Sequence, residues 1–439
     1  MVIDTRYGKI EGKEFDDYVE FLSVPYAKPP VGNRRWKAPE RPEPWEGIYH
    51  ADHVRAIAVQ ELPDMKIYQK EFYSDPEYRF QVSENCLYLN IWMPKYAGEQ
   101  KLPVAYWIHG GGFVLGSSIE MEFDGAQYCK KDVILVSVEY RCNVFGFLAH
   151  SWLSEESEFH SSGNYGLMDQ IAGLEWVYEN IEAFGGDRSR ITIMGQSAGA
   201  MSVQALLLSE KTGSMIAGAI LQSGGAYGCT MVEKRSLQEV EKLGAFFSEY
   251  LNCSNLEELR QKSTEEVRAA AVRLDLLCKK GTYPYFLAPV VDGILLEDGY
   301  DELMDQGRCK NVPCLIGSVK NDLTVTAKML MKKEFSPLYW GCVKFAEKQE
   351  EKGKGPTYVY YFSHDLPGDG SGAFHSMDIW YEMGTMARCW RPWTESDWKL
   401  SDIMVTAWTD FIKTGNPDPD GQLGWKPCSR KNRQVYMFQ

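Results

Sequence analysis

Short, nearly continuous runs of apolar residues dominate the pattern of the chain from residue 87 onward. Four of them occupy residues 87–92, 104–108, 133–138 and 191–194. A strand that is apolar at every position has both faces buried, as in the centre of a parallel sheet. Apolar residues recur at helical spacing in the intervening stretch 168–180 and again in 198–208, directly after the last run. This alternation predicts an α/β fold with a large, mostly parallel central sheet flanked by helices.

The chain before this region has a different pattern. Residues 6–12 have hairpin character, and proline-rich loops run from Pro25 to Pro44. We therefore expect a β-rich lead-in before the main sheet. No linker, repeat or low-complexity tract divides the sequence, which favours one domain over residues 1–439.

The region from about 235 to 280 is predicted to be a helical, cap-like insertion that covers one side of the sheet. Two capping-box signatures, Ser254 with Glu257 and Ser263 with Glu266, predict helix starts within it. A last helix is predicted over residues 401–413, because Gly415 follows it, as glycine commonly does at helix ends.

Composition excludes several classes of function. The net charge of −14 and the scattered Lys and Arg residues would repel nucleic acid. No apolar run is long enough to span a bilayer, and the first residues lack the apolar core of a signal peptide, so we expect a cytoplasmic protein. The eleven cysteines form no CxxC pair, which argues against a metal site or a disulfide framework. We expect no metal and no cofactor.

The main chemical signal is the Gly-Gln-Ser-Ala-Gly sequence of residues 195–199. The bare pattern G-x-S-x-G is common, but here a β-branched strand enters it and an Ala/Leu-rich helix leaves it. This context is typical of a nucleophile elbow, in which glycines allow a strained turn to raise a serine hydroxyl above a sheet. We predict Ser197 as the nucleophile of a serine hydrolase.

A second signal, His-Gly-Gly-Gly-Phe at residues 109–113, follows the strand that ends at residue 108. Hydrolases with a nucleophile elbow place half of their oxyanion hole at this point. The backbone amides of Gly111, Gly112 and Ala198 are the predicted oxyanion donors, and one such donor is worth about 3 kcal/mol in the transition state. The alternative is a flexible glycine turn that binds no ligand.

Hydrolases with this elbow have their triad in the chain order serine, acid, histidine. The base must therefore follow Ser197, and only His364 and His375 do so. We favour His375, which lies in a glycine-rich loop, over His364, which ends an aromatic strand. The predicted acid is Asp322, shortly after an apolar strand; its alternative is a helix N-cap. Three other aspartates, Asp292, Asp298 and Asp301, lie in the same interval and are less suited.

These residues resemble the type B carboxylesterase/cholinesterase family, especially its bacterial para-nitrobenzyl esterase-like members. Besides the segments already described, the resemblance rests on residues 24–32, 83–92, 140–148, 163–170, 183–187, 222–224 and 372–375. It implies an α/β-hydrolase fold and a triad of Ser197, Asp322 and His375. It also implies ion pairs of Glu84 with Arg141 and of Asp187 with Arg34 or Arg35. The candidate substrate pocket contains Gln196 and the aromatic wall Tyr283, Tyr285 and Phe286.

Four departures from the family pattern stand out. The acid is Asp322 where the family usually has Glu, and Gln196 replaces the usual Glu before the serine. No cysteine precedes Cys86, so the disulfide of secreted members is not expected, which favours a reducing compartment. The choline-binding Trp is missing from the segment 75–78, so the sequence does not support a cation–π site for quaternary ammonium.

The predicted activity is hydrolysis of small or medium uncharged carboxylic esters through an acyl-enzyme intermediate. Two alternatives remain open: a catalytically silent, cholinesterase-like adhesion protein, and a lipase or amidase that uses the same triad. For the predicted esterase, the expected partner is a small-molecule ester; the sequence does not indicate an oligomeric state.

Overall fold

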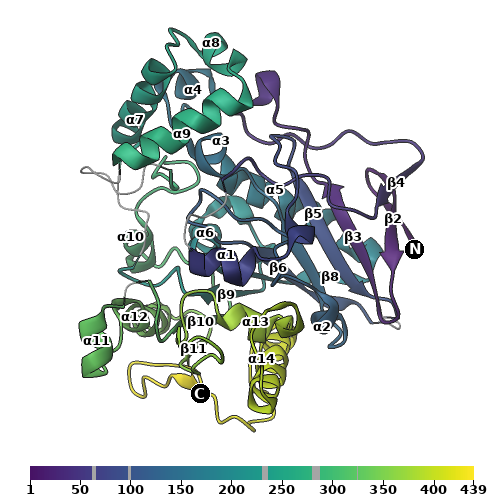
Figure 1. The fold of residues 1–439 in the computed structure, drawn as a ribbon, viewed down its shortest axis with the longest axis vertical. Helices are drawn as coiled ribbons and strands as arrows, with labels where there is room; N and C mark the ends of the chain where they lie inside the picture. Colours follow the sequence, from purple (N-terminus) through teal and green to yellow (C-terminus); the bar gives the residue numbers. More distant parts are fainter. Residues whose placement is uncertain (62–65, 97–99, 230–235, 279–286, 324) are drawn as a thin grey trace.

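A twelve-stranded sheet runs through the molecule in the computed structural model, which describes residues 1–61, 66–96, 100–229, 236–278, 287–323 and 325–439 (Figure 1). In the order in which they pair, the strands are β1 (Val2–Thr5), β2 (Gly8–Glu14), β3 (Tyr18–Pro25), β5 (Tyr88–Pro94), β7 (Ile134–Val138), β6 (Leu102–Ile108), β8 (Gly186–Gln196), β9 (Gly218–Gln222), β10 (Cys314–Val319), β11 (Thr357–Phe362) and β12 (Tyr436–Phe438), with β4 (Ile48–Ala51) beside β2.

The sheet has two parts. The strands β1, β2, β3, β5 and β7 pair antiparallel, whereas every pairing from β7 through β6 to β12 is parallel. The predicted β-rich lead-in and the mostly parallel main sheet are therefore confirmed. All four apolar runs noted in the sequence form central strands.

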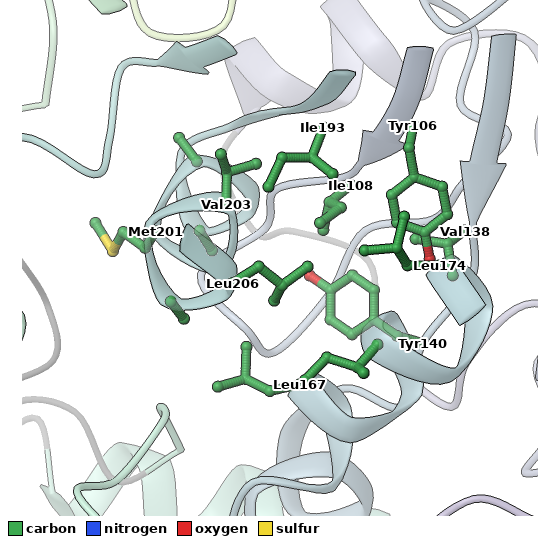
Figure 2. Packing of buried hydrophobic residues seen from close by; sticks show 14 of the residues in the cluster. Tyr106, Ile108, Val138, Tyr140, Leu167, Leu174, Ile193, Met201, Val203 and Leu206 are labelled. Atoms are coloured by element: carbon green, nitrogen blue, oxygen red, sulfur yellow. The ribbon is translucent and has the colours of Figure 1, made fainter. Parts of the chain in front are cut away.

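Both faces of the central strands are buried, which explains why these strands are apolar at nearly every position. On β6, the side chains of Tyr106 and Ile108 join one hydrophobic cluster, while Trp107 points to a second cluster on the opposite face. Figure 2 shows the first cluster, where these residues pack against α5 (Tyr165–Asn180) and α6 (Ala198–Leu208). The helix α14 (Glu395–Thr414) covers the second face and ends at Gly415, which has the left-handed conformation expected of a C-terminal cap.

The predicted helical region contains α7 (Leu237–Tyr250), α8 (Leu256–Gln261) and α9 (Thr264–Cys278). These helices form a group at one end of the molecule, where they contact α3 (Asn143–Phe147) and α4 (Ser151–Glu156) (Figure 1). Ser263 and Glu266 make the predicted reciprocal cap. The other predicted cap is displaced by one residue: Asn255, not Ser254, accepts the hydrogen bond from the backbone of Glu258. A third capping box, Ser236 with Glu239, begins α7.

The remaining helices, most of them short, connect these layers. They are α1 (Lys66–Phe72), α2 (Ala126–Cys129), α10 (Tyr300–Asp305), α11 (Ala327–Lys332), α12 (Pro337–Glu351) and α13 (Asp378–Glu382), with the 3₁₀ helices η1 (Gly32–Arg34), η2 (Pro76–Tyr78), η3 (Ile181–Phe184), η4 (Glu210–Thr212) and η5 (Met386–Arg388). Within the described residues, every helix is too short or too polar to cross a membrane.

The predicted partners of two ion pairs are wrong. Glu84 binds Arg35 through two hydrogen bonds, of 2.7 Å and 2.5 Å, rather than Arg141. Arg141 instead forms two bonds of 2.7 Å with Asp169 of α5. Asp187 accepts hydrogen bonds from the backbone and hydroxyl of Ser189. The pairs implied by the family resemblance therefore do not occur here: Arg35 and Arg141 are each buried beside a carboxylate from another part of the chain.

Candidate active site

The strand β8 and the helix α6 meet in a sharp turn at Ser197. Ser197 has φ 56° and ψ −122°, a conformation that is strained for a residue with a side chain. The flanking glycines are required by contact: a Cβ on Gly199 would lie 2.1 Å from the carbonyl oxygen of Ile108, and one on Gly195 would lie 2.7 Å from the same atom. The turn places Ser197 at the N-terminus of α6, where negative charge is stabilised.

The glycine loop after β6 passes close to this turn. Gly111 and Gly112 have φ values of 98° and 62°, and a Cβ on Gly111 would lie 2.0 Å from the carbonyl oxygen of Leu115. None of the hydrogen bonds among the described residues uses the N–H groups of Gly111, Gly112 or Ala198. Three backbone donors are thus available near the serine, as an oxyanion hole requires.

His375 and Asp322 come from two loops that are joined by a short β-bridge. The backbone N–H of Asn321 donates to the carbonyl of Ala373 at 2.8 Å, so the residues that follow each lie side by side. His375 Nδ1 lies 2.6 Å from Asp322 Oδ1. Asp322 does not cap a helix, because α11 begins at Ala327 and is capped by Thr326.

Asp322 is almost completely buried and yet remains suited to carry a charge. Burial alone would raise the pKa of this carboxyl group. The charge and hydrogen bond of His375, together with hydrogen bonds from Ser223 Oγ at 2.8 Å and the backbone of Leu323 at 2.8 Å, outweigh burial and lower the pKa. An ionised Asp322 can hold the proton of His375 on Nδ1 and leave Nε2 as the acceptor that a base needs.

Gln196 contacts the other side of the imidazole ring. Its Nε2 lies 3.1 Å from His375 Nε2, and its side chain is buried. With Nδ1 protonated, His375 Nε2 accepts a hydrogen bond from the Gln196 amide. The sequence suggested Gln196 as a pocket residue, and the structure shows that it also contacts the predicted base.

Ser197, His375 and Gln196 line one cavity of about 330 Å³. The cavity is apolar on most of its wall. Its lining includes Ser197, His375, Gln196, Gly110, Gly111, Gly112, Leu115, Gly116, Ser376, Ile379, Leu323, Tyr68, Phe72, Tyr73, Phe123, Glu120 and Glu122. A volume of this size accommodates a small or medium organic molecule.

Several residues that the sequence offered as candidates for the site are not among the described residues that line this cavity. His364 Nε2 binds Asp397 at 2.8 Å, in a contact with α14 that is separate from the cavity. Asp292 accepts three backbone hydrogen bonds from residues 294–296, as expected for a turn. The aromatic residues Tyr283, Tyr285 and Phe286 lie outside the described residues. No group of metal-ligating side chains occurs within the described ranges.

The sequence analysis missed three features of the site. Ser223, which donates to Asp322, was noted only within a family motif, although a small polar residue directly after β9 could have indicated it. The aromatic residues of α1 and the two glutamates Glu120 and Glu122 had no pattern that distinguished them from loop and surface residues.

Comparison with known proteins agrees with this architecture. The family model described as "Carboxylesterase family" matches residues 1–339 and 336–439. The para-nitrobenzyl esterase of Bacillus subtilis is 30% identical over 100% of this chain and 94% of its own length, and the fumonisin B1 esterase of Sphingopyxis macrogoltabida is 36% identical over 72% of this chain and 55% of its own.

Solved structures give the same result. A para-nitrobenzyl esterase structure superimposes with a TM-score of 0.87 at 29% identity, covering 100% of this chain and 95% of the other. The structure of a carboxylesterase from Geobacillus stearothermophilus superimposes with a TM-score of 0.81 at 28% identity, covering 99% of this chain and 96% of the other. The fold is thus the α/β-hydrolase fold, and the chain belongs to the carboxylesterase family.

Proposed function

We propose that this carboxylesterase-family chain hydrolyses esters with Ser197 as nucleophile, His375 as general base and Asp322 as the acid that orients the base. Ser197 attacks the ester carbonyl while His375 Nε2 takes its proton, and the amides of Gly111, Gly112 and Ala198 stabilise the oxyanion. The alcohol leaves with a proton from His375. Water then releases the acid from Ser197 by the reverse sequence of proton transfers.

The observation that carries the proposal is the 2.6 Å contact of Asp322 Oδ1 with Nδ1 of His375, which lines the same cavity as the strained Ser197. Because Gln196 occupies Nε2 in this structure, its amide has to move or share that acceptor when Ser197 becomes the donor.

The cavity volume supports small or medium esters as substrates. For the cellular location we propose a bacterial cytoplasm: the ten cysteines whose side chains the structure describes are all free, as in a reducing compartment, and the similar para-nitrobenzyl esterase is from Bacillus subtilis. We also propose that residues 1–439 form one domain, since the sheet continues from β1 to β12.

The test is hydrolysis of para-nitrophenyl esters of increasing acyl length by the parent protein and by Ser197→Ala. We expect the parent to hydrolyse short esters and the variant to lose about 10⁴-fold or more in kcat. The parent should also react covalently with a fluorophosphonate, and the variant should not. A folded parent that shows neither hydrolysis nor labelling would support the binding-protein alternative instead.

A further inference from the structure

Two glutamates form part of the cavity wall without a role in ester cleavage. Glu120 and Glu122 follow the glycine loop, between β6 and α2, and both line the cavity together with Ser197 and His375. The two carboxyl groups are near enough for each to affect the pKa of the other. We call them the acid pair.

The acid pair lacks a positive partner. Glu120 Oε1 accepts hydrogen bonds from Tyr73 Oη at 2.6 Å and from the backbone of Ser117 at 3.2 Å. Glu122 is only 2% exposed, and its Oε2 has no hydrogen-bond partner. In the described part of the chain, no Lys, Arg or His forms an ion pair with either residue.

Three other buried carboxylates are neutralised by arginine, whereas Glu139, Asp378 and Glu382 accept hydrogen bonds only from hydroxyl or backbone groups and do not line the cavity. Glu71 binds Arg391, Asp169 binds Arg141 and Glu84 binds Arg35, each through two hydrogen bonds. A buried carboxylate without such a partner is costly. Burial raises the pKa of both Glu120 and Glu122, because it disfavours the charged carboxylate. A cation from the substrate would supply the positive partner that the pair lacks.

The surrounding wall is suited to an organic cation. Aromatic side chains of Tyr68, Phe72, Tyr73 and Phe123 line the cavity beside the acid pair. Aromatic faces attract ammonium groups, and an ammonium with N–H donors can bind carboxylate oxygens as well. The net charge of −14 also favours the approach of cations over anions.

We propose that the acid pair recognises an ammonium group on the substrate, so that the enzyme prefers esters that carry a primary or secondary amine over neutral esters of the same shape. This inference rests on the proposed function, because it assigns the acid pair to the pocket in which Ser197 acts. It revises the expectation of uncharged substrates. The recognised group has N–H donors, unlike the quaternary ammonium of choline esters.

The first test compares isosteric substrates at pH 7.5. One pair carries the charge in the acyl group, para-nitrophenyl 6-aminohexanoate against para-nitrophenyl heptanoate. The other carries it in the alcohol, 3-aminopropyl acetate against butyl acetate, with acid release followed in a pH-stat. In at least one pair we expect kcat/KM to be about tenfold or more higher for the ammonium ester. A ratio of one or less in both pairs would overturn the proposal without affecting the esterase function.

Variants then assign the preference to the acid pair. Glu122→Gln and Glu120→Gln keep the side-chain shape, and each should reduce the ratio toward one. Glu77→Gln removes the same charge from an exposed position outside the cavity and should retain the parent ratio. A ratio that falls equally in all three variants would indicate general electrostatic attraction and would contradict the proposal.

Binding measured by calorimetry separates this inference from the esterase function. n-Butylammonium chloride and 1-butanol are titrated into the parent and into Glu122→Gln at constant ionic strength. If the parent hydrolyses no ester, the proposed function fails, but tighter binding of butylammonium than of butanol to the parent alone would still support the acid pair as an ammonium site. Equal binding of the two compounds, or no binding, would exclude it.

Discussion

Replacing Asp322 by asparagine tests the proposed triad most directly, because the structure indicates how the new amide would be oriented. Oδ1 of Asp322 accepts from His375 Nδ1 and from the backbone of Leu323, which are both fixed donors. Oδ2 accepts from the Ser223 hydroxyl, which can reverse its hydrogen bond, and from the backbone of Val319 at a longer 3.2 Å. The amide oxygen should therefore take the Oδ1 position, and His375 should keep its proton on Nδ1.

In that orientation the main loss is the negative charge that stabilises the imidazolium formed during attack. Two unit charges about 4 Å apart interact by about 4 kcal/mol at an effective dielectric constant of about 20. This corresponds to a fall of about 10³-fold in kcat. KM should change little, because Asp322 does not line the cavity.

The assay is steady-state hydrolysis of para-nitrophenyl butyrate, with the fold of the variant checked by circular dichroism. Asp365→Asn is the matched control, since Asp365 is an exposed aspartate that pairs with Lys320 on the surface. It should retain the parent kcat. If folded Asp322→Asn loses less than tenfold in kcat, Asp322 is not the acid of the triad and the reasoning fails.

The same variant has a defined effect on stability as a function of pH. The pKa of Asp322 is lowered on folding, so its carboxylate stabilises the fold above the unfolded value of about 3.9. This contribution is lost as the pH falls through the lower, folded value. The parent should thus have a higher unfolding free energy than the variant at pH 7, and the two values should converge in acid. A difference in unfolding free energy that widens below pH 4 would contradict a lowered pKa of Asp322.

Two further predictions concern residues around the site and the fold. Gln196→Glu places an acceptor 3.1 Å from His375 Nε2 where an amide donor now lies, which favours the protonated ring, so the acidic limb of kcat/KM should move to higher pH by up to about one unit. A pH–rate profile measures this, and an unchanged or lower midpoint would refute it. Glu84→Gln leaves the buried Arg35 guanidinium without its carboxylate and should cost about 3–5 kcal/mol in urea unfolding. A loss below about 1 kcal/mol would mean that the backbone carbonyls of residues 260 and 262 alone satisfy Arg35.

Much of the fold was predictable because its signals are local. A strand buried on both faces is apolar at nearly every position, so β5, β6, β7 and β8 could be recognised from runs of four to six residues. The turn at Ser197 needs glycines within two residues on either side, because a Cβ there would collide with the backbone of β6. Helix ends such as Gly415 have equally short-range causes.

The partners of polar side chains could not be predicted from such local signals. Glu84 and Arg141 were predicted as a pair, yet each binds a residue that folding brings from elsewhere in the chain. The contact of Gln196 with His375 joins residues that are 179 positions apart. Sequence spacing carries no information about such contacts, because a hydrogen bond depends on distances of a few ångströms between elements that are placed by the whole sheet.

The sequence by itself thus determined the type of fold, the elbow and the identity of the candidate catalytic residues, since each depends on a short motif or on the order of motifs. Only the tertiary structure decided which carboxylates are neutralised and which are not. Glu71 and Glu122 are both buried glutamates, but one meets Arg391 and the other lines the cavity with an oxygen that has no partner. Burial and charge pairing are properties of packed surroundings, and the packing of a glutamate is not encoded in its immediate neighbours.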